Sequence, residues 1–115
     1  MDNVFFPDAA IDSEVVSPGA VTRKIKARGG KMMMVEVAFA AGGVGPEHDH
    51  PHEQATYCLA GEFVFAVGSE SRTMRPGDTV FIPAAARHGT RCVKEGRLLD
   101  VFTPQRDDFL AKETK

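Results

Sequence analysis

The amino-acid sequence predicts an all-β protein whose antiparallel strands form a sandwich or barrel. Eight short runs are apolar or alternate between apolar and polar residues, and most are rich in Val, Ile, Phe or Thr. Close glycine and proline punctuation, as in Gly29-Gly30, Ala60-Gly61-Glu62 and Pro76-Gly77-Asp78, is typical of hairpins. The expected strands span residues 20–27, 31–40, 54–60, 62–67, 71–74, 79–82, 89–93 and 97–103.

We expect a single domain, because a chain of 115 residues with 43% hydrophobic residues can bury one core. Residues 1–19 are expected to form an N-terminal arm and residues 20–103 the β-barrel. Residues 104–115 are expected to form a short helical or irregular tail. The one helix that the pattern favours spans residues 107–112, and it is too short to stand without packing on another element.

The run MMMVEVAF, residues 32–39, is apolar on both faces of the expected strand. The two sets are Met33, Val35, Val37 and Phe39 on one face and Met32, Met34 and Ala38 on the other. One face can fill the interior, so the other also needs cover. A homodimer is the simplest cover, and the alternative is that the N-terminal arm covers this face.

Charge and composition favour a small-molecule partner. A net charge of -2 without a long basic run gives no footprint for nucleic acid or an anionic membrane. The N-terminal MDNVFFPDAA lacks the basic and apolar regions of a secretory signal, and no stretch has the length of a membrane span, so we expect a cytoplasmic protein. Cys58 and Cys92 form no disulfide-scaffold pattern and are expected to be reduced, packed thiols.

Three of the four histidines lie in PEHDHPHEQ, residues 46–54. His48 and His50 are two residues apart in an extended segment, so both imidazoles project from one face and can converge on one ion. A straight strand would carry Gln54 roughly 20 Å from His48, so its participation needs a bend, which Pro51 can provide. His88, after GDTVFIPAAARH, is a candidate facing ligand. The alternative is a solvated polar loop with His88 as an ordinary surface histidine.

These residues resemble the two motifs of the cupins, which are small jelly-roll barrels that usually hold one divalent metal ion. The matching positions are Gly42, His48, His50, Gln54 and Gly61 for the first motif and Gly77, Pro83 and His88 for the second. The resemblance implies an antiparallel jelly-roll barrel with His48, His50, Gln54 and His88 as metal ligands. Imidazole and amide-oxygen ligands suit one divalent transition metal ion, namely Ni, Zn, Fe, Mn or Co, without selecting among them.

Three positions depart from the cupin motifs. Gln54 stands where Glu is usual, which keeps an oxygen ligand but removes a negative charge and makes the metal a better Lewis acid. Ala85 replaces the glycine of the loop, which predicts that this loop needs no positive φ. Cys92 replaces Asn, so the hydrogen-bonding role that Asn would have is not assigned to this position. His52 could replace Gln54 as the third ligand, but we favour a place at the entrance or beside a ligand.

A second group of residues lies in LLDVFTPQR, residues 98–106. Leu98, Asp100 and Phe102 share one strand face, and if that face is the interior, burial raises the pKa of Asp100 unless the metal or Arg106 offsets it. Such a carboxyl suits proton transfer. Arg106, just after Pro104, could return over the barrel mouth and clamp a carboxylate. The alternative is that the opposite face points inward and Asp100 is exposed.

The segment DVFTPQRDDFL is similar to the end of the pectin-degradation cupins of the KdgF type, which linearise unsaturated uronates. The resemblance implies an enzyme with Asp100 and Arg106 as catalytic residues and Phe102 and Arg106 in contact with a sugar acid. Its product would be the linear 5-keto-4-deoxyuronate. Other metal-dependent cupin activities, such as an Fe-dependent dioxygenase or a sugar isomerase, and a non-catalytic metal- or sugar-binding cupin stay open.

Tyr57 and Arg23 are further candidates for substrate contacts. Arg23 lies between Val21 and Ile25 at strand spacing, so it would face inward if they do. A charged residue on an edge strand is the commoner explanation of that pattern, and Arg23 is left out of the predicted site.

Overall fold

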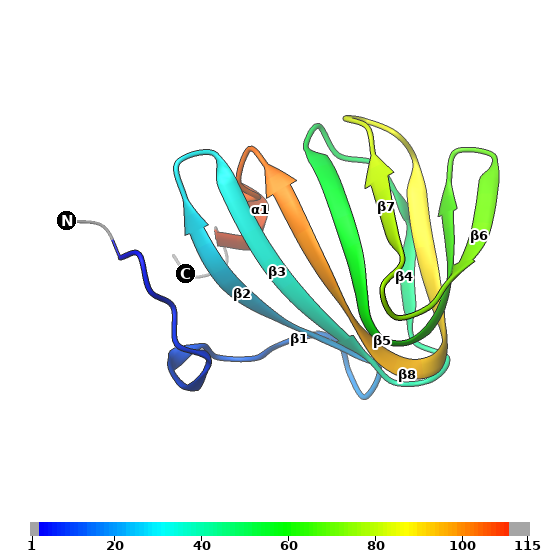
Figure 1. The fold of residues 1–115 in the computed structure, drawn as a ribbon, viewed down its shortest axis with the longest axis horizontal. Coiled ribbons are helices and arrows are strands. Elements are labelled where there is room, and N and C mark those ends of the chain that lie inside the picture. Colours follow the sequence, from blue (N-terminus) through cyan, green and yellow to red (C-terminus); the bar gives the residue numbers. More distant parts are fainter. Residues whose placement is uncertain (1–2, 111–115) are drawn as a thin grey trace.

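The computed structural model describes residues 3–110 and shows an eight-stranded antiparallel sheet folded over on itself in the manner of a jelly roll (Figure 1). The strands are β1 (Glu14–Ser17), β2 (Val21–Gly29), β3 (Met32–Phe39), β4 (Val44–His48), β5 (Glu53–Val67), β6 (Glu70–Met74), β7 (Thr79–Ile82) and β8 (His88–Thr103). The short helices are η1 (Asp8–Ala10) and α1 (Asp107–Leu110). The all-β prediction is confirmed, although the sheet does not close into a complete barrel.

The two longest strands, β5 and β8, bend together near their middles. Residues 53–58 of β5 pair with residues 98–103 of β8, residues 63–67 pair with residues 88–92, and the register shifts between these two blocks. At the bend, Gly61 has φ +84°, and a Cβ there would lie 2.5 Å from the carbonyl oxygens of Lys94 and Glu95. A Cβ on Gly96 would overlap the carbonyl of Ala60. The bend therefore requires glycine on both strands.

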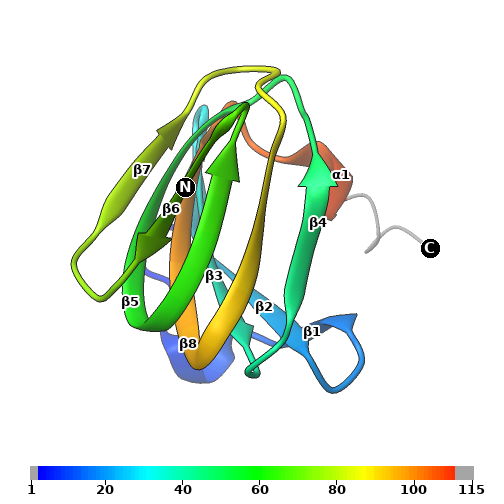
Figure 2. The same ribbon diagram turned by 90° about the vertical axis from the view of Figure 1, so that its right-hand side faces the viewer.

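This bend divides the sheet into two layers, which Figure 2 shows from the side. One half of the β5–β8 pair carries β3 and β7 on its two sides, and β2 and β1 extend this layer beyond β3. The other half carries β4 and β6. Side chains on the inner faces of both layers meet in one interior.

The sequence prediction of separate strands at residues 54–60 and 62–67, and at 89–93 and 97–103, is wrong. Each pair is one continuous strand, and Ala60-Gly61-Glu62 is a bend within β5, not a hairpin turn. The prediction also missed β4 and missed β1, which lies inside the expected arm and pairs with β2. Pro46 within β4 argued against a strand there, and β1 has only four residues, of which Val15 and Val16 are the two apolar ones.

Ala85 has φ 65°, so the prediction that its loop needs no positive φ is wrong. Its backbone N–H donates a 2.8 Å hydrogen bond to the carbonyl of His50. This bond ties the loop before β8 to the segment after β4, and the left-handed conformation that accompanies it costs an alanine about 1 kcal/mol.

The main core lies between the layers, where the rings of Phe39 and Phe63 pack edge to face with centroids 5.1 Å apart. Cys58 and Cys92 are buried in the same cluster and form no disulfide, as predicted. The sequence left open which face of β3 points inward, and burial decides it, because Met33 is fully buried while Met32 is 56% exposed.

The N-terminal arm covers the outer face of β2, where Asp8 of η1 pairs with Lys24 and Lys26 at 3.1 and 2.8 Å. These arm contacts lie over β2 and do not cover the outer faces of β8, β5 and β7. Among residues 3–110 we find no helix with the length and apolarity to cross a membrane.

Candidate metal centre and adjoining cavity

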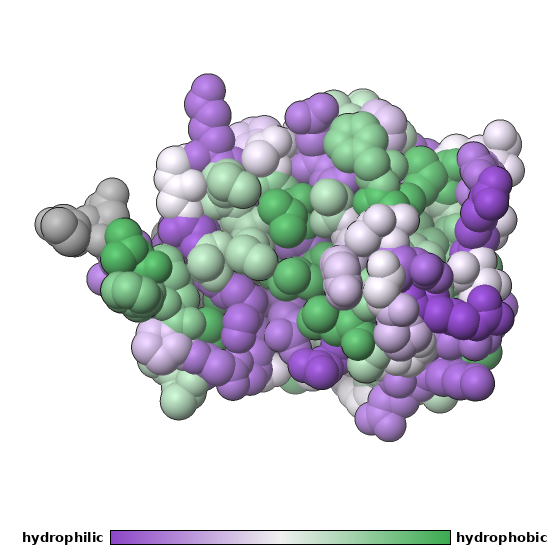
Figure 3. All heavy atoms as spheres, viewed as in Figure 1, coloured by the Kyte–Doolittle hydropathy of each residue, from purple (hydrophilic) through white to green (hydrophobic). Residues whose placement is uncertain are grey.

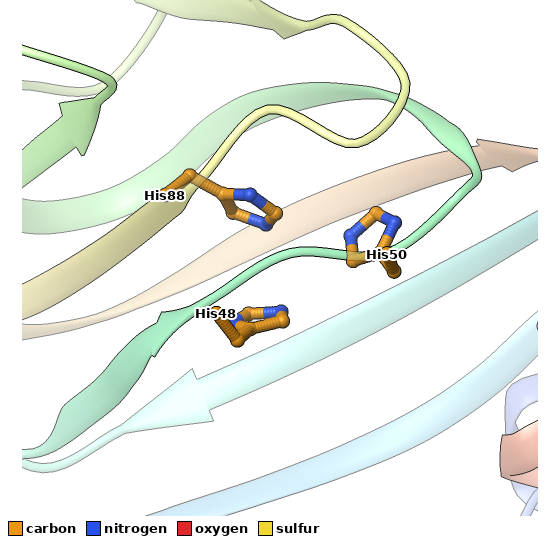
Figure 4. Close-up of side chains that lie close together, drawn as sticks. All are labelled: His48, His50 and His88. Atoms are coloured by element: carbon orange, nitrogen blue, oxygen red, sulfur yellow. The ribbon is translucent and has the colours of Figure 1, made fainter.

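Three histidines from β4, the segment that follows it and the start of β8 face one another at one end of the interior (Figure 4). His48 at the end of β4 and His88 at the start of β8 are partners across the ladder, and His50 follows β4 by two residues. The ring centroids are 4.4 Å apart for His48 and His88, 4.9 Å for His50 and His88, and 5.4 Å for His48 and His50. Each ring offers a nitrogen within 4.8 Å of the other two, which fits a metal site.

Backbone carbonyls fix the orientation of two of these rings. Nδ1–H of His48 donates to the carbonyl of Pro46 at 2.8 Å, and Nδ1–H of His88 donates to the carbonyl of Ala86 at 2.9 Å. A carbonyl can only accept, so Nδ1 carries the proton in both residues. Nε2 of each ring therefore keeps its lone pair for a metal ion.

Gln54 joins the cluster because the chain bends at residues 51 and 52, as the presence of Pro51 predicts. Oε1 of Gln54 lies 3.0 Å from Nε2 of His50, a spacing typical of two ligands at right angles on one ion, which lie about 3 Å apart. Nε2 of Gln54 donates to Oγ1 of Thr56 at 2.9 Å, and the Thr56 hydroxyl donates to Asp100 at 2.7 Å. Thr56 has one hydrogen, so it must accept from Gln54, and the Gln54 oxygen is thereby held toward His50.

The donor set fits a divalent transition metal ion. His50 is buried, and its Nδ1 has no hydrogen-bond partner. Burial lowers the pKa of His50 to about 4, with a further lowering from the charge of Arg106, and burial also lowers the pKa of His88. Both rings are thus neutral at pH 7, which is the form that binds metal.

His52 lies beside the three-histidine cluster without joining it. Its ring centroid is 5.2 Å from that of His50 and 6.4 Å from that of Phe102, and the residue is partly exposed. This placement favours Gln54 over His52 as the fourth ligand.

A cavity of about 240 Å³ adjoins the cluster between the two layers. Its wall includes His48, His88 and Gln54 on the metal side and Asp100 and Phe102 from β8. Alternation in the sequence did not decide which face of β8 points inward. Burial decides it, because Leu98 and Phe102 are each 2% exposed. Asp100 shares their face and borders the cavity.

Asp100 sits in an environment that favours its protonated form. Burial raises the pKa of this carboxyl to about 6, against the lowering effects of its hydrogen bonds with Thr56 and Gln54 and of the charge of Arg106. Asp100 can therefore exchange a proton near neutral pH, and Thr56 and Gln54 connect it to the histidine cluster.

Arg106 returns over the cavity from the C-terminal tail, where the sequence places it. It is 8% exposed, and Nε and Nη2 donate to the two carboxylate oxygens of Asp108 at 3.0 and 2.8 Å. Its guanidinium lies 5.0 Å from the ring of Phe102 and 4.1 Å from that of Phe109. Asp108 occupies one edge of the guanidinium, and the edge that includes Nη1 has no protein partner among the described hydrogen bonds.

Tyr57, which the sequence suggested as a substrate contact, does not line this cavity. Gln54, Thr56 and Cys58 are buried on the inner face of β5, and alternation places Tyr57 on the outer face with 45% exposure. Counting in steps of two residues from Gln54 would have placed Tyr57 on the outer face of the strand.

Arg23 lines the cavity, although sequence reasoning left it out. Its side chain is 10% exposed, and Val21 on the same face is buried. The edge-strand explanation fails because β1 pairs along β2 and makes β2 an internal strand. The inward spacing of Val21, Arg23 and Ile25 was the available signal.

Comparisons with known proteins agree with this arrangement. Residues 35–102 match the family model described as the cupin domain. The pectin degradation protein KdgF of Dickeya dadantii (strain 3937) is 36% identical over 108 residues, which cover 92% of this chain and 97% of that protein. An RmlC-like cupin from Shewanella frigidimarina superposes with a TM-score of 0.88 and 30% identity, covering 94% of this chain and 96% of that one. The structure of KdgF from Halomonas sp. superposes with a TM-score of 0.87 and 34% identity, covering 94% of this chain and 99% of that one.

We expect the protein to retain one divalent ion per chain after dialysis, measured by elemental mass spectrometry. His48→Ala, His50→Ala and His88→Ala should each lose this ion, because each removes an imidazole from the cluster. His52→Ala is the matched control and should retain it. Full metal content in a folded His88→Ala protein would contradict this site.

Proposed function

The chain belongs to the cupin family, and we propose that it converts 4,5-unsaturated uronate monomers to the linear 5-keto-4-deoxyuronate in the breakdown of pectin- or alginate-type polysaccharides. Similarity to two KdgF proteins over nearly their whole lengths supports this activity. The observation that carries it is the position of Asp100, a partly buried carboxyl with a pKa of about 6 that borders a cavity beside the metal centre.

The reaction is an isomerisation and needs no redox cofactor. A proton leaves the C1 hydroxyl, the bond between C1 and the ring oxygen breaks, and the ring oxygen becomes the C5 ketone when C4 gains a proton. Ionised Asp100 accepts the hydroxyl proton, and its protonated form returns one to C4. A divalent cation held by the three histidines and Gln54 would supply Lewis-acid stabilisation of charge that develops on substrate oxygens.

Two further residues of the cavity orient the substrate in this proposal. Arg106 binds the substrate carboxylate through the guanidinium edge that Asp108 leaves open. Phe102, whose ring lies in the cavity wall, packs against one face of the sugar.

The purified, metal-loaded protein should accelerate the loss of the conjugated-alkene absorbance of an unsaturated uronate monomer. Asp100→Asn should lower kcat/KM by at least about 100-fold, because it removes the proton-transfer group. Arg106→Ala should raise KM by about tenfold or more through loss of a charged hydrogen bond. Glu95→Gln and Arg97→Ala, which change exposed residues of the same strand, are the matched controls. No acceleration by the metal-loaded wild-type protein would reject the proposed activity.

The pH profile of kcat/KM should follow the ionisation of Asp100. Because burial raises its pKa to about 6, the carboxylate that accepts the proton predominates at pH 7 and is lost as the pH falls through 6. A bound cation favours the ionised form and can only move the inflection to lower pH. The rate should therefore fall about tenfold per pH unit on the acid side of the inflection. A rate that rises as the pH falls through this range would contradict the role of Asp100 as the base.

We also propose that the chain forms a homodimer through the outer face of the sheet. Met34, Val101, Ala55 and Phe81 lie side by side across β3, β8, β5 and β7, and Phe81 is 59% exposed. Hydrophobic atoms gather in the middle of this face (Figure 3). Burial of such a row by a second copy is favourable, whereas the N-terminal arm lies over β2.

Sedimentation equilibrium should show a dimer for the wild-type protein and a monomer for Phe81→Asp, with unchanged metal content. Thr73→Asp, at an exposed position of β6, is the control and should stay dimeric. A wild-type protein that is monomeric at every concentration would contradict this proposal.

A further inference from the structure

Arg23 is a second buried guanidinium in the cavity, and the proposed reaction leaves it without a role. Its side chain is nine-tenths buried, it borders the same cavity as Asp100 and Arg106, and its Nε has no hydrogen-bond partner. A buried donor without a partner is costly, so such a group in a cavity wall indicates a ligand that supplies the missing acceptor.

Glu14, the ion-pair partner of Arg23, does not give the Arg23 Nε a good hydrogen bond. Oε1 of Glu14 on β1 lies 3.5 Å from Nε, which is an ion-pair distance but too long for a good N–H···O hydrogen bond. Arg106 differs in this respect, because Asp108 accepts from its Nε and Nη2 at 3.0 and 2.8 Å. Nε of Arg23 is therefore a buried donor without a hydrogen-bond acceptor, whereas Nε of Arg106 is satisfied by Asp108.

Both guanidiniums pack against the ring of Phe109, which also lines the cavity. The Arg23 guanidinium carbon lies 3.8 Å from the centroid of this ring and that of Arg106 lies 4.1 Å from it. Packing on a ring uses the flat face of a guanidinium and leaves the N–H groups at its edges available. The two cations are within roughly 8 Å of each other and repel, so an anion that contacts both relieves this repulsion.

The strand register places Arg23 within reach of a ligand that also contacts Asp100. Arg23 pairs with Val37 on β3, and Val37 pairs with Leu98 on β8, which is one inward position from Asp100. Two strand spacings, about 10 Å, separate the backbones of Arg23 and Leu98, and the long arginine side chain covers much of that span.

We propose that Arg23 binds the carboxylate of the sugar acid together with Arg106. This inference rests on the proposed function in taking an acidic sugar as the ligand. It adds a specificity-determining residue, because a site with two guanidiniums rejects a neutral sugar that leaves both without an anion.

The experiment is calorimetric titration of the metal-loaded full-length protein with D-galacturonate, a stable saturated sugar acid, and with D-galactose, its neutral counterpart. The wild-type protein should bind galacturonate more tightly than galactose. Arg23→Gln should weaken galacturonate binding by about tenfold or more and leave galactose binding unchanged, because only the acid uses the guanidinium. Lys24→Gln removes a cation from the other face of β2 and should bind both sugars as the wild type does.

Two further variants separate anion binding from a structural role. Arg23→Lys keeps the charge without the planar fork and should bind galacturonate several-fold more weakly than wild type. If Arg23→Gln does not fold, the galacturonate affinity of Arg23→Lys tests the inference in its place. Glu14→Gln removes the acidic neighbour of Arg23 and should bind galacturonate at least as tightly as wild type. If Arg23 acted only by holding β1, this variant would weaken binding as Arg23→Gln does.

Unchanged galacturonate affinity in Arg23→Gln or Arg23→Lys would overturn the inference, as would equal losses for galacturonate and galactose. Failure of the wild-type protein to bind galacturonate, or weakened binding by Glu14→Gln, would overturn it too. Failure of the proposed activity has a different signature. In that case unsaturated uronate is not consumed, while galacturonate binding still depends on Arg23.

Discussion

The paired bend of β5 and β8 is the constraint on which the site depends. Gly61 and Gly96 let two long strands turn together where any Cβ would meet the backbone of the partner strand. Because of this turn, the two ends of β8 belong to opposite layers, with His88 at its start and Asp100 and Phe102 near its end. All three side chains face one interior, so a single strand supplies a metal ligand, the proposed base and the apolar wall of the cavity.

Electrostatics in this interior follows from burial and from one chain of hydrogen bonds. The low pKa of His50 and the raised pKa of Asp100 have the same cause, since burial disfavours the charged form of each. The chain from Gln54 through Thr56 to Asp100 fixes the Gln54 amide and couples the ligand set to the carboxyl. A neutral amide in place of a carboxylate leaves more positive charge at the metal, which suits stabilisation of negative charge on substrate oxygens.

The sequence contained enough information to predict the histidine cluster, because H-x-H alternation and a distant His88 depend only on strand geometry and chain order. It left open which faces of β3 and β8 point inward, because alternation gives the period of a strand but not which face is buried. It could not distinguish a turn at Gly61 from a bend, since glycine serves both and only the neighbouring backbone decides. Arg23 was misjudged because its exclusion depended on whether β2 was an edge, and β1 had not been recognised as a strand. The φ of Ala85 reflects a backbone hydrogen bond to His50, which residue type does not reveal.

The central claim is that the two layers hold one divalent ion between them beside the cavity. Anomalous diffraction at the absorption edge of the bound metal, from crystals of the metal-loaded protein, tests this most directly. The account predicts a single peak about 2.0–2.3 Å from Nε2 of His48 and His88, from a ring nitrogen of His50 and from Oε1 of Gln54. The absence of a peak between these residues, with the imidazoles turned toward solvent, would contradict it.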